Sequence, residues 1–401
     1  MNKIEAPWGS IPDNWIISSV ATEAKRVTDY VANGSFASLA ENVEYKTEED
    51  YAVLIRLVDY NNSFKGPFVF IDEKAYNFLS KSKLFGGEII ISNVGANVGT
   101  VFLCPYLKYN MSLAPNSITV HFKGNDIFYY YWLRSKYGQH GIKSLITGSA
   151  QPKFNKTAFR QMLIPVPPLD VQNQIAGILS SLDAKIETNN KLNEKLEEMA
   201  QAIFKSWFVD FEPFKDKPFH ETEIGYIPQI FESGILGDLC TFKRGKGLLS
   251  KDAIFGNVPV IAGGMKPACY HNIANTKAPV VTVSGSGANA GYTQIHNVDV
   301  WASDCSFIDS NCENLYYVYC FLSRRPKLLR HSQTGAAQPH VKPADIHRFQ
   351  VVIPTKDVIN EFQQIVKPLF DRIGMNKKEN DRLASLRDTL LPRLMSGELI
   401  V

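Results

Sequence analysis

Hydrophobic residues in two stretches of the chain recur at alternating steps of three and four positions. One stretch runs from Leu182 to Trp207 and the other from Leu369 to Leu394. This spacing is typical of a helix that presents an apolar seam to a partner, and it predicts long helices within residues 167–212 and 354–401. The seam positions are Leu182, Ile186, Asn189, Asn193 and Leu196 in the first helix, and Leu369, Ile373, Asn376, Asn380 and Leu383 in the second.

Residues that favour helix ends border both stretches. Asp170 and Asp357 follow prolines and are suited to act as N-caps of the two helices. Pro392 lies near the end of the second stretch, where it is expected to end or kink the helix near Leu391, because proline lacks the backbone N–H of the helical ladder.

Neither seam can be buried by itself, so each helix needs a partner. The simplest partner is the other helix of the same chain, and an antiparallel coiled coil is therefore expected. Each seam carries two asparagines one step apart, and buried asparagines at such positions cost stability but fix register. In the alternative, these asparagines face solvent in a frayed stretch. From Asp170 to Trp207 the first helix would be about 55–60 Å long.

The remaining regions, 1–166 and 213–353, contain short runs of β-branched residues bounded by Gly, Asn or Pro. Residues 51–58, 88–92 and 278–283 are predicted strands, and residues 125–137 form a candidate helix. The predicted fold class is therefore α+β, with two similar globular domains joined by the two long helices.

The two halves of the chain repeat each other, which is the most informative feature of the sequence. At one constant offset the segment 147–152 (TGSAQP) aligns with 334–339 (TGAAQP), and Tyr129-Tyr130 aligns with Tyr316-Tyr317. At slightly different offsets 95–99 (GANVG) resembles 287–291 (GANAG), and 9–12 (GSIP) resembles 225–228 (GYIP). The conserved order of these matches predicts a pseudo-two-fold internal repeat.

Composition places the chain among globular proteins with no membrane span. Hydrophobic residues make up 45% and charged residues 21% of 401 residues, and the formal net charge is only +3. The N-terminal residues lack the apolar region of a secretory signal, so a cytoplasmic location is expected. The six cysteines form no Cys-x-x-Cys pair and are interpreted as reduced thiols rather than metal ligands.

Positive charge is concentrated in two windows at matching places in the repeat. Residues 134–160 contain six Lys or Arg residues and no Asp or Glu, and the window 324–348 is similarly basic, with Asp345 as its single acid. One such window could be a solvated surface, but two at equivalent places favour contact with the phosphates of double-stranded DNA.

Amide and cationic side chains in these windows are candidates for contact with bases. Residues that recur in both halves, such as Gln151 and Gln338, fit a shared structural role better than the reading of two different sequences. Readers are expected where the halves differ, for example at Lys65, Asn110, Lys143 and Lys153 in the first half and at Arg244, Lys246, His271, His340 and Lys342 in the second. The predicted DNA-binding residues are Lys65, Asn97, Lys143, Gln151, Lys153 and Lys156 in the first half, and Arg244, Lys246, Asn289, Arg330, Gln338, His340 and Lys342 in the second.

Catalytic motifs do not stand out. The sequence has no Asn- or Asp-Pro-Pro-aromatic loop of an adenine methyltransferase and no Walker-type phosphate loop. Asp29 with Glu44 and Lys46 has the spacing of some nuclease metal sites, but the repeat holds no second copy, and no metal site or catalytic residue is predicted. Two alternatives remain open at this point: a stand-alone methyltransferase or nuclease, and a scaffold that binds only protein.

The chain resembles the DNA specificity subunits of type I restriction-modification systems along its whole length. The motifs that carry the resemblance are 202–213 (AIFKSWFVDFEP) at the end of the first predicted helix, 224–228 (IGYIP), and 386–399 (LRDTLLPRLMSGEL) near the C-terminus.

The resemblance implies two target-recognition domains, 1–166 and 213–353, that each read one half of a split, asymmetric DNA target with an unspecified spacer. It also implies that two methylation subunits dock on the paired helices and that restriction subunits join them. S-adenosylmethionine, ATP and Mg are then expected on those partners, methylation is expected on adenine, and this chain is expected to bind no cofactor and to be non-catalytic.

Overall fold

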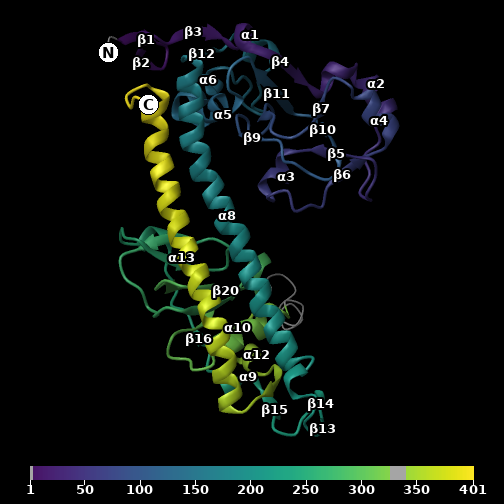
Figure 1. The fold of residues 1–401 in the computed structure, drawn as a ribbon, viewed down its shortest axis with the longest axis vertical. Helices are drawn as coiled ribbons and strands as arrows, with labels where there is room; N and C mark the ends of the chain where they lie inside the picture. The colour runs from purple at the N-terminus through teal and green to yellow at the C-terminus, as the bar shows by residue number, and fades with distance from the viewer. Residues whose placement is uncertain (1–2, 326–339) are drawn as a thin grey trace. The chain divides into compact units, whose positions relative to one another are not determined.

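The computed structural model describes residues 3–325 and 340–401 of the chain (Figure 1). The chain divides into two compact units: unit 1 comprises Met1–Lys185 with Arg382–Val401, and unit 2 comprises Ile186–Asp381. The boundary between them falls inside both long helices, so each unit contains a part of each helix. Predicted Arg330 and Gln338 lie outside the described residues.

The two predicted long helices are α8 (Leu169–Phe208) and α13 (Lys356–Met395), each 40 residues long. Asp170 and Asp357 lie within the first turns rather than at the N-caps, so the N-cap prediction is wrong. The preceding residues already accept the first helical hydrogen bonds, as from Gln172 N to the Pro168 carbonyl. In the first turn, the two carboxylates are still favoured by the partial positive charge of the helix N-terminus.

Pro392 was expected to end or kink α13 near Leu391, but the helix continues to Met395 and so does not end there. Leu394 and Met395 are fully buried in the core of unit 1. Because proline removes only one hydrogen bond near a helix end, burial of this last turn is sufficient to hold it helical.

Helices α8 and α13 pair antiparallel. In unit 2, Asn376 donates its side-chain amide to Asn193 at 2.8 Å, and Asn189 donates to Asn380 at 2.9 Å. Residue numbers therefore rise along one helix as they fall along the other. Asn189 and Asn376 are each only 1% exposed, so the asparagines lie between the helices and not in a solvated, frayed stretch.

The other predicted seam residues follow the same face. Ile373 is buried, and Leu196 and Leu369 pack against the core of unit 2. Leu182, Ile186 and Leu383 are half-buried.

In unit 1, a half-buried ion pair joins the same two helices. Arg387 Nη1 of α13 lies 2.6 Å from Asp183 Oδ1 of α8, and the Tyr131 hydroxyl donates to the other Asp183 oxygen at 2.6 Å. Burial raises the pKa of Tyr131, and the bond to Asp183 raises it further, so the hydroxyl stays protonated as a donor. This cluster fixes the globular part of unit 1 to both long helices.

The globular part of unit 1 contains two four-stranded β-sheets, with the spatial strand orders β4-β11-β8-β9 and β6-β5-β10-β7, and the two-stranded sheets β1-β2 and β12-β3. The first of these four-stranded sheets is antiparallel throughout and packs one face on α5 around Phe122, Phe128 and Trp132.

The strands of unit 1 are β1 (Lys3–Ala6), β2 (Gly9–Pro12), β3 (Ile16–Ser19), β4 (Ala24–Asp29), β5 (Ala52–Ile55), β6 (Val69–Ile71), β7 (Lys83–Leu84), β8 (Ile89–Ser92), β9 (Val101–Leu103), β10 (Asn110–Leu113), β11 (Ser117–Phe122) and β12 (Leu163–Val166). Its helices before α8 are α1 (Val20–Glu23), η1 (Tyr30–Asn33), α2 (Phe36–Asn42), α3 (Leu57–Asn61), α4 (Glu73–Phe78), α5 (Asp126–Arg134), α6 (Lys136–Ser144) and α7 (Lys156–Gln161).

The globular part of unit 2 has the equivalent antiparallel sheet, β16-β22-β19-β20, and a smaller sheet, β18-β17-β21. Its core centres on α10 and on the aromatic rings of Phe204, Tyr317 and Phe362. The strands are β13 (Phe219–Thr222), β14 (Gly225–Pro228), β15 (Glu232–Ile235), β16 (Lys243–Arg244), β17 (Val258–Ile261), β18 (Cys269–His271), β19 (Val280–Ser284), β20 (Thr293–His296), β21 (Trp301–Ala302), β22 (Cys305–Ile308) and β23 (Gln350–Ile353). The helices are η2 (Glu212–Phe214), α9 (Leu236–Leu239), η3 (Ser250–Asp252), η4 (Gly287–Asn289), α10 (Leu315–Ser323) and α12 (Pro343–His347).

The predicted internal repeat is confirmed by hydrogen bonds at matching places. Val20 N donates to the Met162 carbonyl at 2.9 Å in unit 1, and Leu236 N donates to the Phe349 carbonyl at 2.8 Å in unit 2. The segments 9–12 and 225–228 are both the second strand of a β-hairpin. The predicted α+β class is likewise confirmed.

We expect Asp183→Ala to destabilise unit 1 by about 2 kcal/mol, since two hydrogen bonds to a charged group are lost, the Tyr131 hydroxyl loses its acceptor and Arg387 keeps only its pair with Asp388. Urea unfolding at neutral pH measures this change. The control is Glu187→Ala, which removes only the exposed pair with Lys191 on the same helix and should shift the midpoint very little. Equal shifts for the two variants would contradict the role given to Asp183.

Candidate nucleic-acid interface

The acid-free window of unit 1 forms helix α6, a loop and the start of helix α7. Lys143 is exposed near the end of α6, and Gln151 and Lys153 are exposed on the loop. Lys156, the first residue of α7, is half-buried because its Nζ lies 3.0 Å from Asp29 Oδ1 at the end of β4. Three of these four predicted DNA-binding residues therefore face solvent, and the fourth is held in an ion pair.

The loop is rigid because its backbone is bonded on two sides. Thr147 and Lys153 exchange hydrogen bonds of 2.8 and 3.0 Å, and Gly95 N donates to the Pro152 carbonyl at 2.9 Å. Gly148 has a φ of +86°, a conformation that a side chain would strain. The loop is thus fixed against the glycine-rich turn that contains exposed Asn97, and Gln151 and Lys153 are directed outward.

A cavity of about 770 Å³ lies beside this loop. Its apolar wall is formed by α2, with Phe36 at its mouth, and its polar wall includes Asn93 and Asn116. Lys153 and Lys156 also line it, so cationic groups lie next to an open apolar surface.

The matching place in unit 2 carries different side chains. Arg244 is exposed at the end of β16, and its guanidinium lies 2.5 Å from Asp304. Lys246 follows in the same basic turn, and His340 pairs with Ser286 as Lys153 pairs with Val94 in unit 1. Lys342 is exposed at the N-cap of α12. These predicted residues gather at one end of the central sheet.

Asn97 and Asn289 occupy equivalent turns. The Asn97 carbonyl accepts from Thr100 N at 3.2 Å, and the Asn289 carbonyl accepts from Tyr292 N at 2.9 Å. This shared backbone role agrees with the expectation that recurring residues serve the architecture.

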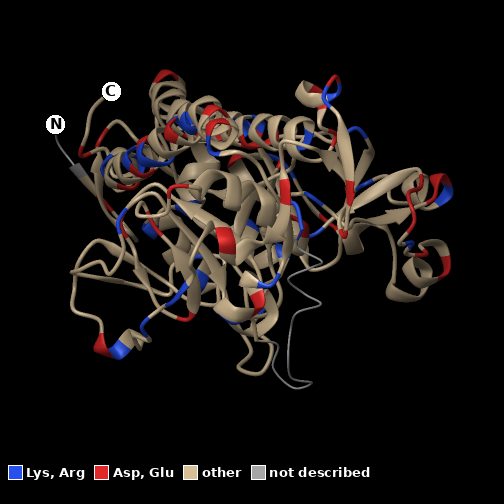
Figure 2. Cartoon of the chain, turned by 90° about the horizontal axis from the view of Figure 1, so that it is seen from below, with Lys and Arg blue, Asp and Glu red and all other residues tan. Residues whose placement is uncertain are grey.

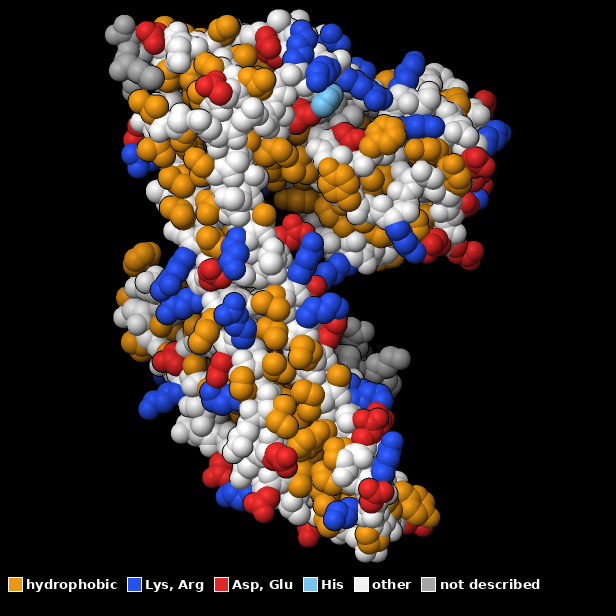
Figure 3. Space-filling model, in the orientation of Figure 1, with side chains coloured by type: hydrophobic (Ala, Val, Ile, Leu, Met, Phe, Trp, Pro, Cys, Tyr) orange, Lys and Arg blue, Asp and Glu red, His pale blue; other side chains and the backbone are white. Residues whose placement is uncertain are grey.

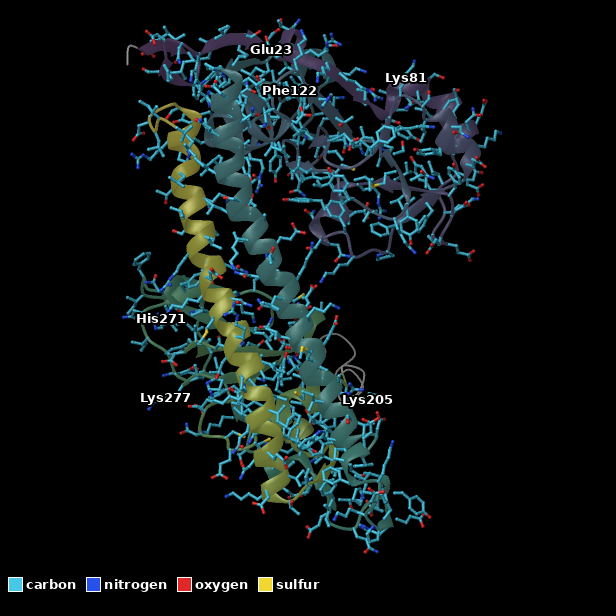
Figure 4. The ribbon with its side chains drawn as sticks, viewed as in Figure 1. Glu23, Lys81, Phe122, Lys205, His271 and Lys277 are labelled. Carbon is cyan, nitrogen blue, oxygen red and sulfur yellow. The ribbon has the colours of Figure 1, made fainter. Side chains whose placement is uncertain are left out.

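Other predicted residues lie elsewhere. Lys65 is exposed in the turn after α3, and Asn110 is exposed at the start of β10. His271, labelled in Figure 4, is 5% exposed, and its ring nitrogen accepts from Ile254 N at 3.0 Å. The prediction that His271 reads a base is therefore wrong, because its imidazole is buried and already hydrogen-bonded.

Sequence reasoning missed two groups of residues. The first is the acidic or amide partners at the sheet end, Asp29, Asn116 and Asp304, whose role depends on strand pairing. The second is an exposed basic group on unit 1, which the Lys25-Arg26 dipeptide could have indicated. It comprises Lys25, Arg26, Lys81 and Lys123, of which Lys81 is labelled in Figure 4. Along the rest of the ribbon in Figure 2, acidic and basic residues are interspersed.

Two of the three residues with the spacing of a metal site, Asp29 and Lys46, form ion pairs instead. Asp29 pairs with Lys156, and Lys46 pairs with Asp50 at 2.6 Å. Within residues 3–325 and 340–401, no group of three or more His, Cys, Asp or Glu side chains could hold a metal ion. Burial raises the pKa of the Cys305 thiol, next to Asp304, to about 12, so this thiol is protonated at neutral pH. No helix in the described part of the chain is long and apolar enough to cross a membrane.

Comparisons with known proteins agree with this architecture. The family model described as the type I restriction modification DNA specificity domain matches residues 27–198 and again residues 228–385. A type I restriction enzyme MjaIX specificity subunit from Methanocaldococcus jannaschii is 26% identical, over 99% of this chain and 96% of the relative. The HindI specificity subunit from Haemophilus influenzae is 23% identical, over 62% of this chain and 71% of the relative.

Among solved structures, the S subunit of a type I restriction-modification system from M. genitalium has the same fold. Its TM-score is 0.59 at 19% identity, and the match covers 97% of this chain and 98% of the other. The two matches of the family model cover most of the sequence and coincide with its two repeats. The chain therefore belongs to the family of type I restriction-modification DNA specificity subunits.

Proposed function

We propose that this specificity subunit binds double-stranded DNA through the sheet ends of both units and reads a bipartite, asymmetric target with an unspecified spacer. The observation that carries the proposal is the outward-facing loop of Gln151 and Lys153, whose counterpart in unit 2 presents His340 and Lys342. Cationic side chains on a rigid loop neutralise phosphates without a large cost in ordering entropy.

The two units share a backbone framework but differ in the side chains that the framework presents. Unit 1 combines Lys153 with an apolar cavity, whereas unit 2 presents Arg244 and Lys246. Base edges are discriminated by the pattern of donors, acceptors and methyl groups. Different side chains on one framework therefore support two unlike half-sites.

The paired helices are proposed to set the spacer. Forty helical residues correspond to about 60 Å, or about 18 base pairs at 3.4 Å each. The asparagines at the seam, Asn189, Asn193, Asn376 and Asn380, are proposed to hold the helices in one register, because a shift would leave buried amides without partners.

The same helices are proposed to receive two methylation subunits, which bind S-adenosylmethionine and modify adenine. Restriction subunits that use ATP and Mg join these to cut DNA. Hydrophobic side chains exposed along the helices would supply part of this docking surface (Figure 3). They include Ile178, Leu192, Met199, Met375 and Leu386.

Catalysis is assigned to those partners and not to this chain. We expect the isolated subunit to show no saturable binding of S-adenosylmethionine by titration calorimetry, with the assembled methylation complex as the positive control. Stoichiometric binding to the isolated chain would instead favour a stand-alone methyltransferase.

A seven-residue insertion into each long helix tests the role of the helices. Placed between Lys185 and Ile186 and between Asp381 and Arg382, the insertions leave the contacts inside each unit unchanged. Each adds about 10 Å, so the spacer should lengthen by about three base pairs while both half-sites stay the same. The measurement is the adenine-methylation pattern of cells that express the variant with its methylation subunits.

The insertion into α8 alone is the matched control, and it should abolish methylation because the seams no longer align. An unchanged spacer in the double insertion would contradict the proposal.

Substitution of Lys143 on α6 and Lys153 on the loop tests phosphate contact. Lys143→Ala with Lys153→Ala should weaken binding to all duplex sequences and reduce the slope of log K against log salt concentration by up to about two. Fluorescence anisotropy over a series of salt concentrations measures the slope. Lys108→Ala, an exposed cation of unit 1 outside this loop, is the control and should leave the slope unchanged. A protein-only scaffold predicts no salt-dependent DNA binding for any of these proteins.

A further inference from the structure

The central sheets of the two units carry opposite charges at one equivalent position. In unit 1, Asp29 pairs with Ile118, which pairs with Ile91 on the next strand. In unit 2 the same row is Arg244, Ser306 and Val283. Arg244 therefore occupies the place that Asp29 occupies in unit 1.

The backbone hydrogen bond next to this position is the same in both units. Asn93 N donates to the Asn116 carbonyl at 3.0 Å, and Gly285 N donates to the Asp304 carbonyl at 3.1 Å. Asp304 thus takes the place of Asn116, and Gly285 takes the place of Asn93. The difference between the units at this position lies in the side chains on a shared backbone.

Asp304 fixes the guanidinium of Arg244. One carboxylate oxygen lies 2.5 Å from Arg244 Nη2, and the other accepts the Ser286 hydroxyl. A Cβ at Gly285 would lie 2.7 Å from Arg244 Nη1, so the absence of a side chain there allows the guanidinium to lie across the backbone. The arginine is held in one orientation by groups on two separate segments, residues 285–286 and Asp304.

Arg244 is nevertheless open to solvent. Its side chain is 45% exposed and that of Asp304 is 37% exposed. Exposed Lys246 follows two residues later, and its Nζ lies 6.0 Å from the centre of the Trp301 ring. The fixed guanidinium therefore lies within a cationic surface that a DNA duplex can approach.

The chemistry of this arrangement selects one base. Guanine presents two acceptors, N7 and O6, in the major groove, and the planar arginine fork donates to both. Adenine and cytosine place an amino donor in this groove, which repels the fork, and thymine places a methyl group there. Because arginine has five N–H donors, the bond to Asp304 leaves others for the base.

In unit 1 the equivalent position cannot act in the same way. Asp29 is a carboxylate that is largely buried, with a side-chain exposure of 16%, and it is engaged by Lys156. The two units therefore place different chemistry at one position of the shared framework.

We propose that Arg244, positioned by Asp304 and Ser286, reads one guanine in the half-site bound by unit 2, and that unit 1 has no such reader at the equivalent position. This assignment rests on the proposed function. It adds one specific base and the residue that reads it.

The adenine-methylation pattern of cells that express each variant with its methylation subunits tests the assignment. Arg244→Ala should relax one guanine of one half-site to any base, a loss of discrimination of roughly 10- to 100-fold. The spacer and the other half-site should not change. Arg244→Lys keeps the charge but not the fork, and it should relax the same guanine.

A positioning role for Asp304 has its own readout. Asp304→Asn, which is nearly isosteric, should relax the same guanine by a smaller factor and leave all other positions unchanged. The matched controls are Asp29→Asn at the equivalent position of unit 1 and Lys277→Ala, an exposed cation of unit 2 labelled in Figure 4. Neither should change the specificity at this guanine.

Three results would overturn the assignment. The first is a wild-type target in which neither half-site contains a guanine. The second is an Arg244→Ala variant that methylates every site more weakly with the motif unchanged, since this indicates a phosphate contact. The third is a change at different bases in Arg244→Ala and Asp304→Asn. If the wild-type complex produces no bipartite motif, the proposed function fails, and the assignment fails with it.

Discussion

The antiparallel pairing of α8 with α13 is the interaction on which the rest of the structure depends. Each compact unit includes a part of both helices, so neither unit can complete its core unless the helices pair. Apolar side chains provide the burial, while Asn189 and Asn376 place amide groups at positions where water is excluded. Buried amides cost free energy unless they find partners, and in the observed alignment Asn189 bonds to Asn380 and Asn376 bonds to Asn193. The pairing therefore converts a sequence repeat into one defined register.

The two units share the backbone of the sheet end but differ in the side chains that it carries. Backbone hydrogen bonds around the sheet end are the same in both units, while the side chains there are Asp29, Asn116 and Lys153 in one and Arg244, Asp304 and His340 in the other. A framework held by main-chain bonds tolerates such changes because its stability does not depend on them. This independence of framework and side chains is what the proposed reading of two unlike half-sites requires.

Some features were readable from the sequence because they rest on local regularity. The long helices, the seam asparagines and the repeat follow from spacing alone, and Lys143, Gln151 and Lys153 were found from the absence of nearby acids. Other predictions failed where burial overrides local preference. Helix α13 passes through Pro392 because its last turn is buried, and His271 is enclosed by the smaller sheet of unit 2. The base-reading role of the remaining candidates stays a prediction.

The sequence by itself determined the fold class, the duplication, the pairing of the helices and the location of the basic windows, since each depends on periodicity or composition along the chain. Only the tertiary structure decided which charged side chains are engaged and which are presented. Asp29 with Lys156, and Arg244 with Asp304, are far apart in sequence. Packing of α7 against β4 brings the first pair together, and the pairing of β16 with β22 brings the second. Electrostatic interactions depend on distance in space, and no local pattern encodes that distance.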